Sequence, residues 1–134
     1  MTLASGPFEV HLTSEREGDP EKGVTLGRVS IDKQFSGDLE ATSRGEMLTA
    51  MSEVEGSAGY VAIELVSGRL HGRSGTFVLQ HSGTMARGAQ SLSVTVVPDS
   101  GTDQLVGIAG RMAINIDEEG KHSYDFEYTL GGTS

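Results

Sequence analysis

The sequence predicts an all-β protein in which eight antiparallel strands close into a single barrel. Apolar and polar residues alternate along eight separate runs, short glycine-containing turns separate these runs, and no amphipathic helix of ordinary length interrupts them. Closure removes the free edges of such a sheet. A barrel of about eight strands has an interior that side chains just fill, or that holds one small ligand. A sandwich of two sheets is the alternative architecture.

Length, charge and composition limit the kinds of function. The 134 residues suit one barrel domain over 1–134, with a tail at 131–134 that we expect to fray. Ten Lys and Arg against nineteen Asp and Glu give a net charge of minus nine, which disfavours nucleic acid and anionic membranes as partners. The chain has no cysteine, its first residues lack the basic and apolar regions of a signal peptide, and no run is as long as a membrane span. We therefore expect a cytoplasmic protein.

The first three runs occupy the N-terminal part of the chain. Alternation over 8–13 predicts a strand that stops at the charged turn 15–23, and the run 24–35 predicts a second strand. The run 38–51 contains Ala, Glu and Met, which also suit a helix. Its threonines, serine and glycine weaken that alternative, so we predict a third strand.

The central stretch 57–85 predicts a long hairpin with its tip near Leu70. That tip places Tyr60 opposite Gln80 and Glu64 opposite Thr76. On this register one face is apolar and the other polar. The apolar face comprises Val61, Ile63, Leu65, Phe77, Leu79 and His81.

Three more strands are expected after the hairpin. The run 92–96 ends at Pro98 and precedes a connection with one helical turn at 102–105. The runs 108–117 and 122–130 then alternate clearly on either side of a compact turn at 118–121.

Five blocks of sequence resemble a known family. They are GDLEATSRGEML (37–48), GYVAIE (59–64), GRSGTFVLQHSGTM (72–85), VVPDSGT (96–102) and HSYDFEY (122–128). In these blocks the chain resembles a bacterial domain-of-unknown-function family that has the allene oxide cyclase-like barrel fold, a lipocalin-like architecture. The resemblance implies the barrel but no reaction, because fold alone does not carry function. No catalytic residue of the plant cyclases can be matched here.

Five residues are the candidates for a ligand site: His81, Tyr60, Glu64, Gln80 and Glu46. Glu46 and Glu64 suit a general acid and base, with Tyr60 and Gln80 positioning a substrate, if their face lines a pocket. The alternative is an exposed ion pair of Arg44 with Glu64, which does no chemistry. His81 on an apolar strand is either a hydrogen-bonded core residue or a ligand-holding group in a lumen.

Other motifs are weaker evidence for a function. Asp99-Ser100-Gly101-Thr102 matches the short aspartic peptidase motif, but Pro98 intervenes, and a polar turn is the simpler interpretation. The four histidines have no ligand spacing, and no phosphate-binding loop occurs, so we expect neither a metal nor a cofactor.

Three hypotheses for function follow. The first is a barrel that binds a small apolar or weakly polar molecule in its lumen. The second is an enzyme that uses the same lumen for a cofactor-free isomerisation or cyclisation, with a Glu or His as base. The third is a non-catalytic oligomeric interaction module. An open cavity favours the first two and a filled barrel the third. The apolar residues of the strands also exceed what one small lumen can bury, and this predicts a homo-oligomer.

Overall fold

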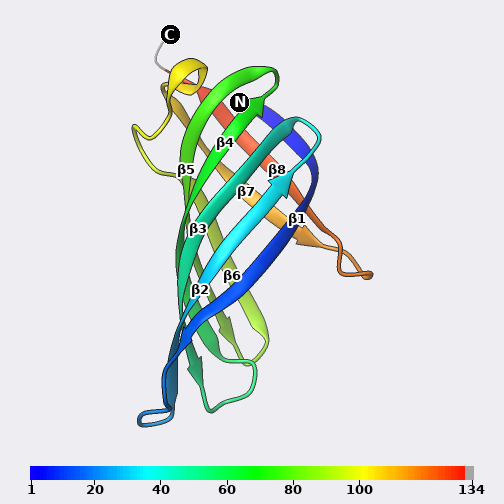
Figure 1. The fold of residues 1–134 in the computed structure, drawn as a ribbon. Helices are drawn as coiled ribbons and strands as arrows, with labels where there is room; N and C mark the ends of the chain where they lie inside the picture. The colour runs from blue at the N-terminus through cyan, green and yellow to red at the C-terminus, as the bar shows by residue number, and fades with distance from the viewer. Residues whose placement is uncertain (132–134) are drawn as a thin grey trace.

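The computed structural model describes residues 1–131, and in it eight antiparallel strands, paired in chain order, close into one barrel (Figure 1). The strands are β1 (Thr2–Glu17), β2 (Val24–Phe35), β3 (Leu39–Ser52), β4 (Ala58–Leu70), β5 (Arg73–Ala86), β6 (Ala89–Val96), β7 (Ile108–Ile116) and β8 (His122–Leu130). One short 3-10 turn, η1 (Asp103–Leu105), lies between β6 and β7. The barrel closes because β8 pairs with the first half of β1, from Thr2 opposite Tyr128 to Phe8 opposite His122.

The predicted barrel is therefore confirmed, and a two-sheet sandwich is excluded. The third run is a strand, and the helical turn expected at 102–105 is η1. The first strand begins earlier than predicted, at Thr2, because residues 2–7 pair with β8. Of the tail 131–134, for which we expected fraying, residues 132–134 lie outside the described part of the chain.

The predicted register of the central hairpin is wrong. The turn consists of His71 and Gly72, whose φ angles are 48° and 81°, and Leu70 pairs with Arg73. Two consecutive residues with positive φ form the tight hairpin turn that matches the twist of the flanking strands, and glycine accepts that conformation without strain. Glu64 therefore lies opposite Leu79, and Tyr60 opposite Gly83.

This three-residue shift exchanges the faces of β4. An odd shift moves every side chain of a strand to the other face of the sheet. Val61 and Ile63, predicted for the core, point outward and are 53% and 52% exposed. Glu64 and Val66 point inward and are fully buried, on the same face as His81.

Side chains fill the end of the barrel that carries the β2–β3 and β4–β5 turns, which is the upper end in the orientation of Figure 1. Its core residues are Ala4, Phe8, Phe35, Leu39, Ala41, Val66, Leu70, Phe77, Leu79, Val94, Val96, Leu105, Ile108, Met112, Tyr124, Phe126 and Tyr128. The hydroxyl of Tyr124 donates to the Ser36 carbonyl (2.6 Å) and accepts from the Leu39 amide (2.8 Å), which ties β8 to the β2–β3 turn. This end has the packing of an ordinary core.

The lower half is open along one side. A single residue pair, Thr95 with Arg111, joins β6 to β7, whereas β5 and β6 share eight pairs. Below that pair in Figure 1, the earlier part of β6 extends to the lower end of the barrel, whereas β7 and β8 diverge from it. The inner face of β1–β6 is therefore only partly covered. Apolar residues on it, such as Met51 and Leu92, remain exposed.

Candidate ligand-binding site

An apolar cavity of about 280 Å³ lies on the inner face of β3–β6 in the open half. Its lining residues are Met47, Thr49, Met51, Ala58, Gly59, Tyr60, Gly83, Thr84, Met85, Gln90, Ser91 and Leu92. Strand pairing arranges the inward members in cross-strand rows. One row is Thr49, Tyr60, Gly83 and Leu92, and the next toward the open end is Met51, Ala58, Met85 and Gln90.

Directly above these rows lies a buried polar cluster of Glu64, Lys33, His81 and Ser43. The Glu64 carboxylate accepts hydrogen bonds from Ser43 Oγ (2.7 Å) and His81 Nε2 (2.9 Å), and Lys33 Nζ lies 3.1 Å from its Oε2. Lys33 Nζ also lies 5.1 Å from the ring centroid of Phe8, a cation–π contact. The four side chains of the cluster come from the consecutive strands β2, β3, β4 and β5, and the ion pair of Lys33 with Glu64 lies enclosed in the barrel interior.

The surroundings of Glu64 keep it ionised. Burial alone would raise the pKa of this carboxyl, but the His81 hydrogen bond, the Lys33 charge and the Ser43 hydrogen bond outweigh it and lower the pKa from 4.5 to about 2. An ionised carboxylate only accepts hydrogen bonds, so Nε2 of His81 carries the proton that faces Glu64. No buried side-chain polar atom among the described residues lacks a partner.

Tyr60 connects the cluster to the cavity. Its hydroxyl lies 3.3 Å from His81 Nδ1, and its ring lines the cavity. The ring packs on Gly83, where an added Cβ would lie 2.5 Å from Tyr60 Cε1, so a glycine is required at this position. Burial, and secondarily the charge of Glu64, raise the pKa of Tyr60. The hydroxyl therefore stays neutral, and it lies where the cavity meets the buried cluster.

Of the five candidates from the sequence, the structure brings His81, Tyr60 and Glu64 together and leaves two outside. Gln80 points outward on β5, opposite Ile63. Glu46 also points outward, opposite Ile63 on the other side, and forms an exposed ion pair with Arg28 (3.2 Å). The predicted pairing of Arg44 with Glu64 is wrong, because Gly45 lies opposite Glu64.

Sequence reasoning missed Lys33 and Ser43. Each shares the inward parity of its strand: Lys33 stands between Ile31 and Phe35, and Ser43 follows Leu39 and Ala41. Lys33, a single charged residue in the apolar row of β2, was therefore the signal in the sequence that could have indicated this cluster. Burial of a lysine requires a partner of opposite charge, which points to an inward-facing acid elsewhere.

Elsewhere in residues 1–131, the largest hollow described and the Asp99 turn differ in character from this cavity. A larger hollow of about 1220 Å³ lies against β1–β5 and the β7–β8 turn, and many of its lining residues, such as Asp32, Arg44 and Thr42, are exposed polar ones. In the Asp99 turn, Ser100 Oγ accepts from the Val78 amide (3.0 Å), as a polar turn requires. Within residues 1–131, no three His, Asp or Glu gather closely enough to hold a metal ion.

Comparisons with known proteins agree with this architecture. The model of the family described as "Protein of unknown function (DUF3224)" matches residues 4–128. The chain belongs to the DUF3224 family. A crystal structure of a DUF3224 protein of unknown function from Shewanella oneidensis MR-1 is 51% identical in sequence, with a TM-score of 0.94 over 99% of both chains. The family resemblance inferred from the sequence blocks is thus confirmed.

A search of curated proteins found no match. Among the helices of the described residues, none has the length and apolar character needed to cross a membrane.

Proposed function

We propose that this DUF3224 protein binds a small apolar or weakly polar molecule in the open half of its barrel. The observation that carries the proposal is the apolar cavity with the Tyr60 hydroxyl at its base. Ligand sites are concave, mostly apolar and provided with a few placed polar groups, and about 300 Å³ is the lower end of their usual size. The buried cluster above the cavity holds Tyr60 in place through His81.

Binding is better supported than catalysis. A general base works best when its pKa lies near the operating pH, whereas the pKa of Glu64 is lowered to about 2. Ser43, Lys33 and His81 also occupy both of its oxygens. His81 is only 3% exposed and engages Glu64 and Tyr60 through its two ring nitrogens. Neither proposed base therefore has a lone pair directed at the cavity.

A cavity-filling substitution tests the proposal. Ala58 lines the cavity, so we expect Ala58→Phe to weaken binding of the neutral fluorophore N-phenyl-1-naphthylamine by at least about tenfold, because the new ring occupies the ligand's space. Ala109→Phe on the exposed outer face of β7 is the matched control and should leave the dissociation constant unchanged. Equal affinity in wild type and Ala58→Phe, measured by fluorescence titration, would place the probe elsewhere.

We also propose that the protein forms a homodimer through the outer face of β4. Val61, Ile63 and Leu65 form an exposed apolar stripe there, continued by Leu48 on β3. Charges of both signs flank it, which suits a self-complementary surface, and twofold dimers are the commonest oligomers. Light scattering should show a dimer for the wild type and a monomer for Ile63→Lys. A wild-type monomer at high concentration would contradict the proposal.

A further inference from the structure

We propose that the cavity selects uncharged aromatic molecules and rejects anionic ones such as fatty acids. This inference rests on the proposed function and specifies the chemical class of the ligand. It follows from two features of the cavity: the kind of apolar side chain in its wall, and the distribution of charge around it.

The apolar wall consists largely of methionine. Met47, Met51 and Met85 come from β3 and β5, and Tyr60 lies between them on β4. The unbranched thioether adapts its shape to a ligand and makes favourable contacts with aromatic rings. Tyr60 adds an aromatic face and a neutral hydroxyl that can hydrogen-bond one oxygen or nitrogen of the ligand. A flat aromatic molecule with one such atom uses all of these groups.

The charges near the cavity disfavour an anion. Among the described residues that line it, none is charged. Deeper in the barrel, Lys33 is already paired with Glu64. Burial of a carboxylate or sulfonate without a cationic partner is costly.

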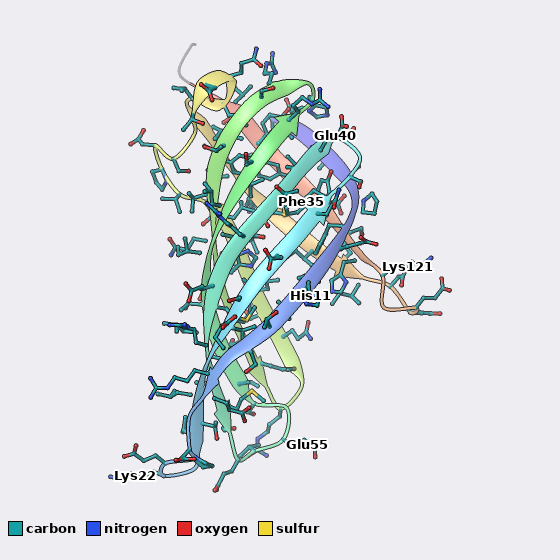
Figure 2. The ribbon with its side chains drawn as sticks, in the orientation of Figure 1. His11, Lys22, Phe35, Glu40, Glu55 and Lys121 are labelled. Carbon is teal, nitrogen blue, oxygen red and sulfur yellow. The ribbon has the colours of Figure 1, made fainter. Side chains whose placement is uncertain are left out.

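The turns at the open end carry no net positive charge that could compensate an anion. The β3–β4 turn carries Glu53 and Glu55, and the β5–β6 turn carries Arg87. A hydrogen bond from Gly88 N to Gly56 O holds the two turns together. The β1–β2 turn with Lys22 lies at the same end, where Figure 2 labels Lys22 and Glu55. Acidic groups outnumber basic ones in these turns, and the whole chain carries a net charge of minus nine.

A matched pair of probes tests the selectivity. N-phenyl-1-naphthylamine and 1-anilinonaphthalene-8-sulfonate share the same aromatic skeleton, and only the second carries a negative charge. We expect the sulfonate to bind the wild-type protein at least about tenfold more weakly than the neutral amine. Equal or tighter binding of the sulfonate would overturn the selectivity and leave the proposed function standing, whereas no binding of either probe would overturn both.

A lysine placed in the wall should reverse the rejection. Met51 lines the cavity and is 56% exposed, so Met51→Lys can keep its ammonium group in water beside the ligand. We expect this variant to bind the sulfonate about fivefold more tightly than the wild type and the neutral amine no more tightly. Met51→Gln, which is polar and uncharged, is the control.

Leu92→Lys, at a second exposed lining position, repeats the test if Met51→Lys melts at a lower temperature than the wild type. No gain in sulfonate affinity in a folded lysine variant would mean that the missing cation is not the cause of the rejection, and would overturn the inference.

Discussion

The Glu64→Leu variant should lose about 3–5 kcal/mol of its free energy of unfolding, measured by urea denaturation. Leucine removes the acid that pairs with both Lys33 and His81, and these two side chains are almost fully buried. An uncompensated ammonium group would then remain in the barrel interior, next to a serine hydroxyl that has also lost its acceptor.

The matched control is Glu46→Leu, on the neighbouring strand. Glu46 also pairs with a cation, Arg28, but the two side chains are 61% and 54% exposed. Exposed pairs of this kind contribute about 0–1 kcal/mol, so the control should change stability little. Lys33→Met added to Glu64→Leu should recover part of the loss, because no unpaired charge then remains. A loss as small as that of Glu46→Leu would show that the cluster is hydrated and not buried.

Acid should destabilise the protein through the same carboxyl. The folded-state pKa of Glu64, about 2, lies below its ordinary value of 4.5. The unfolded chain therefore takes up a proton at Glu64 at a higher pH than the folded protein does. The contribution of Glu64 is complete above about pH 5 and is lost as the pH falls through 4.5 toward 2, a total of about 3 kcal/mol.

Glu64→Gln isolates this contribution from those of the other acidic residues. Denaturation of both proteins at several pH values should show a difference in stability that is largest near neutral pH and shrinks as the pH approaches 2. A difference that stays constant between pH 6 and 3 would mean that the pKa of Glu64 is not lowered by folding.

Alternation of apolar and polar residues was sufficient to predict the eight strands and the closed barrel, because period two survives small errors in strand bounds. It was not sufficient for the register of the central hairpin. The register depends on which two residues adopt positive φ, and three glycines near Leu70 offered several tips. His71 in that conformation is unusual for a residue with a side chain, so the sequence pointed to no single tip.

The same error explains how the candidate site was only partly predicted. The chemistry of their side chains is enough to predict His81, Tyr60 and Glu64 as site residues, and the structure brings the three together. Gln80 is a candidate only on the predicted register, which places it opposite Tyr60, whereas in the structure Gly83 takes that place. Lys33 is distant in sequence from the hairpin and reaches Glu64 only through the pairing of β2 with β3 and β3 with β4. A contact of that kind depends on tertiary structure, although the apolar row around Lys33 hinted at it.

Nuclear magnetic resonance of the methionine methyl groups is the most direct test of ligand binding in the open half of the barrel. Spectra of the protein labelled with ¹³C at these methyl groups are recorded with and without N-phenyl-1-naphthylamine. The chain has five methionines, which gives five signals. Met47, Met51 and Met85 line the cavity, whereas Met1 is an exposed terminus and Met112 lies in the filled core. We predict that the signals of Met47, Met51 and Met85 shift in a saturable way while that of Met1 does not. Saturable binding that leaves these three signals unmoved would contradict the proposal that this cavity is the site.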